Sequence, residues 1–217
     1  MRIDLHSHTI FSDGDLTPSE LVRRAMELGH TALAITDHVD VTNIDFVVPA
    51  LVKAVELSED YITVLPGVEL TYVPPNKIDM MAKRAKALGA QIVIVHGETV
   101  VEPVPAQTNL RSVMSPNVDV LAHPGLITLE EAEIAAGNDV ALEITGRYGH
   151  NITNGHVANM ARKAGAKMVV NSDAHTIGNL MDEKTATIIA KGAGLTDEEI
   201  KKALNDTPYE MIKHLLK

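Results

Sequence analysis

Short apolar segments alternate along the chain with segments whose apolar residues recur at helical spacing. The apolar segments, rich in Val and Ile, predict seven strands, at the first residues of the chain and near 32–36, 62–70, 91–95, 118–122, 140–145 and 167–170. The helical spacing predicts helices near 17–28, 48–58, 77–88, 128–136 and 153–164, and three more near 181–191, 197–204 and 208–216. Because the strands are continuous apolar runs rather than alternating ones, we expect a parallel sheet that is buried on both faces.

No linker, low-complexity tract or change of composition interrupts these strand–helix units. We therefore expect a single α/β domain over residues 1–217, with its polar motifs in 1–176 and the helices of 181–217 packed on it. The pattern also predicts one long polar loop, over 99–116, and long loops on a functional rim commonly contact the substrate.

Most of the histidines follow the ends of predicted strands, and two carboxylates take equivalent places. These residues are His6, His8, His38, His96, His123, His175, Glu69 and Asp173. In a βα barrel the carboxyl ends of the strands meet on one rim, whereas the strand ends of an open sheet do not converge on one point. Histidines that only pack in a core would be scattered along strands and helices. The pattern therefore favours a closed or nearly closed barrel over an open, doubly wound sheet.

The first of these strand ends carries two histidines and a carboxylate within eight residues. His6 and His8 are two apart, so on a strand both imidazoles point to the same face. The turn that contains Gly14 then brings Asp13 back over them. Two imidazoles and a carboxylate are typical of a divalent-cation site. The alternative is that one histidine caps the strand and the other is packed.

The order of the motifs resembles the polymerase and histidinol phosphatase (PHP) domain family. The motifs are His6-x-His8, Ser12-Asp13-Gly14, Thr36-Asp37-His38, Pro66-Gly67-Val68-Glu69, His96, His123-Pro124 and Ser172-Asp173-x-His175. The resemblance runs from residue 1 to about 176. It implies a distorted seven-stranded, TIM-like (β/α)7 barrel with a centre of two or three metal ions that hydrolyses phosphate esters.

The resemblance also implies how the ligands are shared. His6, His8, Glu69 and Asp173 would hold one ion, and Glu69 would bridge to a second ion that is held by His96 and His123. Asp13, His38 and His175 would hold a third ion. The chain departs from the family at Asp13, because many relatives have a histidine there, and this puts the third site in doubt.

The ligand types themselves indicate the kind of metal. Imidazoles mixed with carboxylates suit Mn²⁺, Zn²⁺ or Fe²⁺, whereas Mg²⁺ and Ca²⁺ sites use mostly oxygen. The sequence has no cysteine and neither a G-x-S-x-G nor a P-loop pattern, so it offers no familiar covalent nucleophile. We expect in-line attack on a phosphoester by a hydroxide that bridges the metal ions.

Other residues are weaker candidates for the site. Arg147 is either a phosphate ligand or a surface residue of a Gly-flanked loop, and Arg111 is a weaker candidate of the same kind. His150 is either a residue that contacts the substrate or donates a proton to the leaving group, or a solvated loop residue. Glu143 lies within a strand, where a buried charge needs a partner; it either faces the site or pairs structurally. Asp4 either orients a ligand imidazole or forms a salt bridge at the start of its strand, and Glu98 is another candidate to orient a ligand imidazole.

Composition and charge limit the classes of partner and the cellular location that the protein is expected to have. The net charge is −10 and aromatic residues make up 3%, which argues against a large nucleic-acid surface with basic stripes and stacking platforms. The sequence shows no secretory signal and no apolar run of about 18 residues that would span a membrane. The absence of cysteine fits a reducing cytosol, so a cytoplasmic location is expected. Composition does not distinguish a monomer from an oligomer.

Three functions remain. The leading one is a phosphomonoesterase that acts on a small phosphorylated metabolite, such as histidinol phosphate or a nucleotide. The second is a phosphodiesterase or exonuclease of the PHP type, with the same metals and a polymeric substrate. The third is a non-catalytic barrel that serves as a subunit of an RNA-processing particle, a role that favours a basic surface and tolerates the loss of metal ligands.

Overall fold

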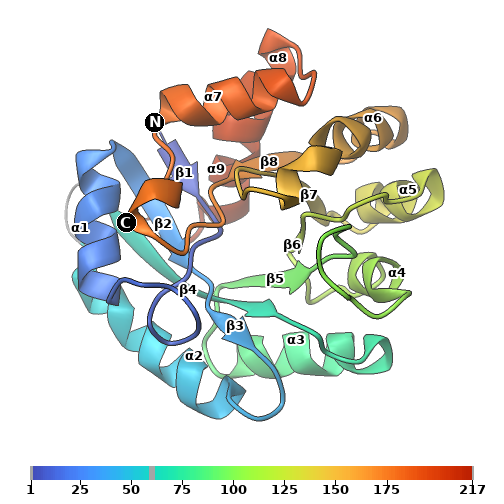
Figure 1. Ribbon diagram of the computed structural model, residues 1–217. Coiled ribbons are helices and arrows are strands. Elements are labelled where there is room, and N and C mark those ends of the chain that lie inside the picture. Colours follow the sequence, from blue (N-terminus) through green and yellow to red (C-terminus); the bar gives the residue numbers. More distant parts are fainter. Residues whose placement is uncertain (1, 59–61, 217) are drawn as a thin grey trace.

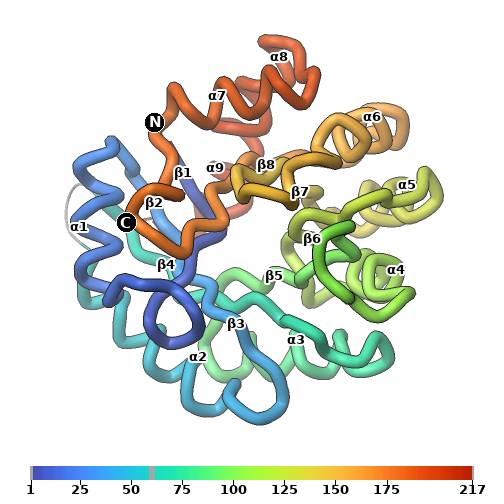
Figure 2. Tube along the Cα trace, viewed as in Figure 1, coloured from blue at the N-terminus to red at the C-terminus, as the bar shows by residue number. Residues whose placement is uncertain are grey.

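The computed structural model describes residues 2–58 and 62–216 and contains a nearly closed barrel of parallel strands (Figures 1 and 2). The strands are β1 (Arg2–Asp4), β2 (His30–Ile35), β3 (His38–Val39), β4 (Thr63–Leu70), β5 (Ile92–His96), β6 (Val120–Ala122), β7 (Ala141–Thr145) and β8 (Met168–Asn171). They follow the order β1-β2-β4-β5-β6-β7-β8, and β3 pairs with β4 beyond the end of β2. The expectation of a distorted seven-stranded TIM-like barrel is confirmed, with β3 as a short addition.

Helices α1 to α6 connect the strands on the outside of the barrel, and α7 to α9 follow the last strand. The α-helices are α1 (Pro18–Glu27), α2 (Ile44–Lys53), α3 (Ile78–Ala87), α4 (Thr108–Val113), α5 (Leu129–Gly137), α6 (Asn154–Ala164), α7 (Glu183–Gly192), α8 (Asp197–Lys201) and α9 (Thr207–Ile212). Short 3₁₀ turns η1 (Ala54–Leu57), η2 (Pro75–Lys77), η3 (His150–Thr153) and η4 (Ile177–Asn179) and a π-helical turn η5 (Lys202–Asp206) adjoin them.

Several sequence-based boundaries are wrong. The helix expected at 48–58 begins at Ile44, continues through Pro49 and ends in η1, so the preceding loop is shorter than expected. The loop expected over 99–116 contains α4, whose short polar stretch lacks a clear apolar period. The helix expected at 197–204 continues as η5 after Lys201, and the last helix ends at Ile212 rather than near 216.

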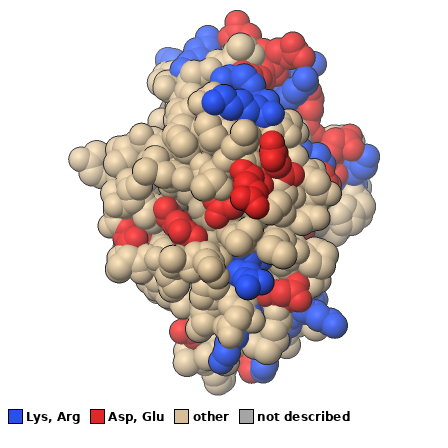
Figure 3. All heavy atoms as spheres, turned by 90° about the vertical axis from the view of Figure 1, so that its right-hand side faces the viewer, with Lys and Arg blue, Asp and Glu red and all other residues tan. Residues whose placement is uncertain are grey.

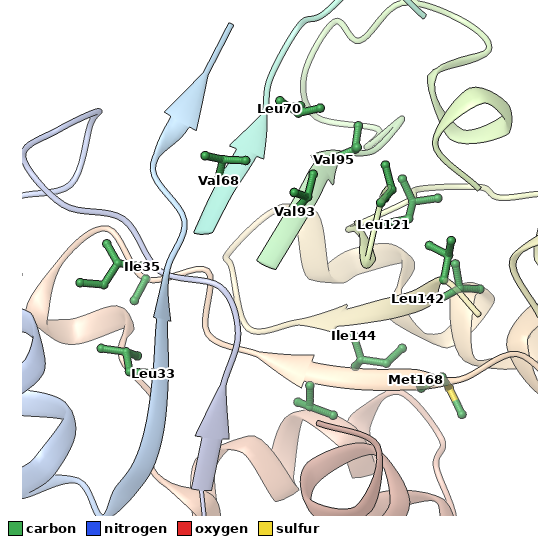
Figure 4. Packing of buried hydrophobic residues seen from close by; sticks show 14 of the residues in the cluster. Leu33, Ile35, Val68, Leu70, Val93, Val95, Leu121, Leu142, Ile144 and Met168 are labelled. Carbon is green, nitrogen blue, oxygen red and sulfur yellow. The ribbon is translucent and has the colours of Figure 1, made fainter. Parts of the chain in front are cut away.

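The barrel has one core inside the strands and a larger one outside them. Because successive strand residues point to opposite faces, Val93 and Val95 of β5 pack outward against the helices, as Figure 4 shows. Ile92 and Ile94 of the same strand pack inward. This double burial explains why the strands are continuous apolar runs in the sequence.

Helix α9 closes the barrel at the end where the strands begin. Ile212 is fully buried and belongs to the inner cluster with Ile3, Ala32 and Ile92, which lie near the starts of their strands. In Figure 1 the loops that follow the strands face the viewer, and α9 lies behind the barrel. The C-terminal segment therefore fills the inside of the barrel from below.

The seam between β1 and β8 is closed by side chains and by the chain beyond the strand ends. The Arg2 guanidinium donates to the carbonyl of Val170 at 2.8 Å and to Asp4 at 2.7 Å. Asp4 in turn accepts hydrogen bonds from the backbone NH and the hydroxyl of Ser172. Further up, the backbone NH of His8 donates to the carbonyl of Ala174 at 2.8 Å. Asp4 is thus a structural residue of the seam, in a salt bridge at the start of its strand, which is one of the two roles expected for it.

Candidate metal centre

The strand ends bring the predicted ligands together in one buried cluster. His6 and His8 come from the end of β1, His38 from β3, Glu69 from β4, His96 from β5 and His123 from beyond β6, whereas Asp173 and His175 follow β8. The ring centres of His8 and His175 are 4.0 Å apart, and those of His96 and His123 are 4.5 Å apart. All of these residues except His38 are buried, although most of them are polar or charged.

Asp13 reaches the cluster through a tight turn. A Cβ on Gly14 would lie 2.5 Å from the backbone of His8, so only glycine allows the chain to pass this close. The turn places Oδ1 of Asp13 3.2 Å from Nε2 of His175 and 3.5 Å from Nε2 of His38. The sequence-based expectation that the turn returns Asp13 to the histidines agrees with this geometry.

The donor atoms fall into four groups, in each of which they lie within 4.8 Å of one another. The groups are His8–Asp13–His38–His175, His6–His8–Glu69, His6–His123–Asp173 and His96–His123–His150. The first group is the third-ion set implied by the family resemblance, with His8 added. The last contains His150, which the sequence left open between a substrate contact and a solvated loop residue, and lacks Glu69.

Most donor pairs in the cluster have the spacing of atoms around shared cations, although Nδ1 of His38, which contacts the Thr71 hydroxyl at 2.6 Å, also lies 2.9 Å from Oε2 of Glu69. Nε2 of His6 is 3.3 Å from Oε2 of Glu69, and Nε2 of His8 is 3.3 Å from Oδ1 of Asp173. Nε2 of His123 is 3.4 Å from the other Glu69 oxygen, Oε1. Two donors that are each about 2.1 Å from one ion lie about 3.0 to 3.5 Å apart, whereas direct N–H···O bonds cluster near 2.9–3.0 Å. Glu69 directs one oxygen to each side, as a bridging carboxylate does.

The same atoms lack hydrogen-bond partners. Across the described parts of the chain, ten buried side-chain atoms have none, and eight of them belong to this cluster. The eight are Nε2 of His6, both ring nitrogens of His8, both oxygens of Glu69, Nδ1 of His123, Nδ1 of His150 and Oδ1 of Asp173. Buried polar atoms without partners are costly, and a cation bound among them satisfies them. The residues present therefore fit a divalent-metal centre.

Second contacts fix the histidine rings in orientation. Nδ1 of His6 lies 2.8 Å from Oε1 of Glu143, and Nδ1 of His175 lies 3.1 Å from the carbonyl oxygen of Asp173. With Nδ1 held in this way, Nε2 of each ring is left to face the cluster. Glu143, which the sequence left open between two roles, faces the site. Glu98 does not, because its carboxylate accepts the backbone NH of Asn109 at 3.0 Å.

Burial and neighbouring charges shift the pKa values of several residues in the cluster. Burial would raise the pKa of Glu69, but the neighbouring imidazoles of His6 and His38 outweigh it and hold that pKa well below its usual value. Burial lowers the pKa of His8 to about 3, so this ring is neutral and keeps a lone pair for a cation. Asp173 behaves as Glu69 does, since burial would raise its pKa but the neighbouring imidazoles of His6, His8 and His123 together outweigh that effect and hold the pKa well below its usual value.

Backbone strain is present at two of the candidate ligands. His123 has φ of +27° and Asp173 has φ of +50°, in the left-handed region that non-glycine residues avoid. Such strain is commonly found where side-chain direction matters for function.

A cleft of about 410 Å³ opens above the cluster. Arg147 and His150 both line it, and among the described residues that line it Arg147 is the one Lys or Arg. Arg111 is exposed and does not line the cleft. Tyr72 and Glu102 are among the lining residues that sequence reasoning missed, because neither belongs to a recognisable motif.

A sequence model of the PHP domain matches residues 4–152 of the chain. The chain belongs to the PHP family. It is 51% identical over 218 residues to an uncharacterised protein of Methanocaldococcus jannaschii, with 99% of the chain and 100% of that protein covered. It is 29% identical to a probable phosphatase of Shewanella loihica, with 98% and 92% covered. It is 32% identical to the 5′-3′ exoribonuclease Rnm of Salmonella typhimurium, but spans only 48% of that protein's length and 75% of its own.

Solved structures share the fold at low sequence identity. A protein chain in the structure of archaeal ribonuclease P with mature tRNA aligns at a TM-score of 0.72 and 15% identity, with 97% of this chain and 90% of that chain covered. The histidinol phosphate phosphatase of Lactococcus lactis, complexed with zinc, L-histidinol and phosphate, aligns at 0.63 and 16% identity, with 90% and 94% covered. At these identities the likeness is one of fold. Within residues 2–58 and 62–216, no helix has the length and apolar character needed to cross a membrane.

Proposed function

We propose that this protein is a metal-dependent phosphomonoesterase that acts on a small phosphorylated molecule. The observation that carries the proposal is the cluster of buried, unpartnered imidazole and carboxylate atoms beneath a cleft that contains one guanidinium, Arg147. Two or three divalent cations such as Mn²⁺, Zn²⁺ or Fe²⁺ would supply an activated water and would stabilise charge on the phosphoryl oxygens. The PHP domain and the phosphatase relatives support a hydrolase.

The side chains of the chain have separate tasks in this proposal. Arg147 binds the phosphate, for which a guanidinium provides two parallel donors. Glu143 keeps Nε2 of His6 directed at the centre. The buried carboxylates Glu69 and Asp173 supply negative charge that offsets the charge of the cations.

The rim of the barrel favours a small substrate over a polyanion. The loops that follow the strands cover 5–17, 36–43, 71–77, 97–107, 123–128, 146–153 and 172–182. Their Lys and Arg residues are Lys77 and Arg147, against eight Asp and Glu residues. In Figure 3, where this rim forms the left-hand edge, the middle of that edge shows Asp and Glu side chains but no Lys or Arg. A nucleic-acid strand would instead require several cations along its path.

Exposed apolar side chains are common on the rim loops, and one of them, Tyr72, lines the cleft. They are Ile10, Phe11, Val41, Tyr72, Val100, Val101, Leu126, Tyr148, Ile152 and Ile177, which come from most of the rim loops. A single guanidinium within an apolar and acidic rim suits a substrate with one phosphate on a largely uncharged body.

A phosphodiesterase or 5′-3′ exonuclease activity is the second candidate. The 32% identity to an exoribonuclease favours it, and the same metal centre would serve both reactions. The acidic rim counts against it.

The test is hydrolysis by protein loaded with Mn²⁺ or Zn²⁺. The substrates are aryl and alkyl phosphomonoesters, histidinol phosphate, nucleoside 5′-monophosphates, diesters matched to the aryl and alkyl monoesters, and a 5′-phosphorylated oligoribonucleotide. We expect cleavage of monoesters with an uncharged alcohol part, and its loss in His123→Ala but not in His156→Ala, whose ring contacts the carbonyl of Ile127 outside the centre. Preference for the diesters or the oligonucleotide would replace this proposal by the second candidate. Full metal loading without any hydrolysis would favour a binding subunit.

A further inference from the structure

The cleft contains a carboxylate that none of the family motifs includes. Glu102 lies in the loop between β5 and α4, and its Oε2 atom is 2.8 Å from Nε2 of His96. The same oxygen accepts a hydrogen bond of 3.0 Å from the hydroxyl of Tyr72. The other oxygen, Oε1, is 3.4 Å from Nε2 of His150. Glu102 therefore links residues of three different loops or strands on the solvent side of the centre.

The contact between His96 and Glu102 joins a ring nitrogen to a carboxylate oxygen and needs a positive charge at that point. Nδ1 of His96 lies 3.2 Å from the carbonyl oxygen of Gly97, which can only accept a hydrogen bond, so Nδ1 carries the proton of the neutral ring. Nε2 then presents its lone pair to the carboxylate of Glu102. In this neutral form the lone pair and the carboxylate oxygen would repel each other at 2.8 Å. The contact is stable when the ring takes a second proton, which the carboxylates of Glu69 and Glu102 favour by raising the pKa of His96 against the effect of burial, or when one divalent cation binds both atoms.

His150 adds an independent observation. It is buried, and its Nδ1 atom has no hydrogen-bond partner. Its ring centre lies 4.5 Å from that of His123, and His96, His123 and His150 each offer a nitrogen within 4.8 Å of the others. A histidine on a solvated loop would direct both nitrogens to water. Three imidazoles and one carboxylate make a donor set that suits Zn²⁺, Fe²⁺ or Mn²⁺.

The two loops that carry these residues are held in place. The backbone NH of Glu98 donates to Oδ1 of Asn109 at 2.9 Å, and the backbone NH of Asn109 donates to Oε1 of Glu98 at 3.0 Å. This reciprocal pair fixes both ends of the segment that contains Glu102. A side chain placed on Gly149 would touch Val101 at 3.7 Å, so the loops of Glu102 and His150 lie side by side.

We propose that Glu102 and His150 bind the same divalent cation as His96 and His123. Two rim loops, rather than strand ends alone, then complete the ligand set on the cleft side of the centre. The Tyr72 hydroxyl orients the carboxylate of Glu102 for this role. The inference rests on the metal centre of the proposed function and is independent of the substrate and of the reaction.

The test compares metal binding by Glu102→Gln, His150→Gln and the matched control Glu98→Gln. In Glu102→Gln the amide oxygen still accepts from Tyr72, so the variant removes the charged ligand without removing that contact. Glu98→Gln makes the same change on the same loop and keeps the acceptor for Asn109. Bound metal per chain is measured by inductively coupled plasma mass spectrometry, affinity by chelator competition, and ligand geometry by the visible spectrum of the Co²⁺-loaded protein.

We expect Glu102→Gln and His150→Gln each to lower the affinity for one metal ion by at least about tenfold and to change the Co²⁺ spectrum. Glu98→Gln is expected to match the wild type in both measurements. Wild-type stoichiometry, affinity and spectrum in Glu102→Gln and His150→Gln would overturn the inference, even if the wild type hydrolyses phosphomonoesters. Conversely, the expected metal results in a protein that cleaves no phosphoester would uphold this inference and overturn the proposed function.

Discussion

Nδ1 of His6 lies 2.8 Å from Oε1 of Glu143, and both side chains are fully buried. Glu143 also accepts hydrogen bonds from the side-chain amide of Asn171 at 2.9 Å and from the backbone NH of His123 at 3.1 Å. One carboxylate on β7 therefore orients a residue from β1 and the backbone beyond β6. Its two oxygens accept hydrogen bonds from three donors, so both oxygens must be acceptors for all three hydrogen bonds to form.

Glu143→Gln is expected to weaken metal binding. The amide replaces one acceptor by a donor, so one of the three hydrogen bonds is lost and the ring of His6 is held less firmly. We expect metal affinity to fall by about 10- to 100-fold and the free energy of unfolding to fall by about 1–3 kcal/mol. Isothermal titration with Zn²⁺ and urea unfolding measure the two effects, with Glu133→Gln on the exposed face of α5 as the control. Unchanged affinity would show that His6 needs no such support.

Removal of metal is expected to lower thermal stability. Without cations, the buried carboxylates of Glu69 and Asp173 and the rings around them retain unpartnered atoms. Any ion that binds only the folded state stabilises it, by about 2.7 kcal/mol at a free concentration of about 100 times Kd. Scanning calorimetry before chelation, after chelation and after return of Mn²⁺ or Zn²⁺ tests this. Equal melting temperatures in the three samples would contradict a metal centre in the folded protein.

Ile212→Ala is expected to destabilise the whole barrel. Ile212 is fully buried in the inner core, and removal of its side-chain atoms leaves a cavity beneath the strands. We expect a loss of about 2–5 kcal/mol in the free energy of unfolding. The control is Ile188→Ala on α7, where the side chain is 58% exposed and the change should stay within about 0.5 kcal/mol. Similar losses in the two variants would exclude a closing role for α9.

Arg147→Lys is expected to impair turnover of a phosphomonoester. A lysine keeps the charge but cannot form two parallel hydrogen bonds to a phosphate. Because a hydrogen bond to a charged group contributes about 1.5–3 kcal/mol, we expect kcat/KM to fall by about 10- to 100-fold. Steady-state kinetics on the best monoester measures the effect, with the exposed Arg111→Lys as the matched control. An unaffected Arg147→Lys would remove this residue from phosphate binding.

The barrel was predictable from the sequence because its evidence is local. The strands are apolar runs, and a residue such as His96 or His123 follows each run directly, so chain order alone places it on the rim. The turn around Asp13 was predictable for the same reason, since Gly14 marks where the chain folds back.

The parts that sequence reasoning missed depend on distant contacts. Glu102 reaches His96 because Glu98 and Asn109 bond reciprocally and shape the loop between them, and neither residue type predicts such a pair. Ile212 is likewise buried by residues of several strands at one end of the barrel, and this environment exists only after the strands have assembled. The role of Glu143 stayed open because its partners come from other strands.

The closure of the seam has a consequence for synthesis of the protein. His6 and His8 leave the ribosome early, whereas Asp173 and His175, which face them across the seam, follow more than 160 residues later. At about 5–20 residues per second, the nascent chain exposes its first histidines for roughly 10 to 30 s before their partners exist. The donor cluster therefore stays incomplete until the segment after β8 has been made, late in synthesis of the chain.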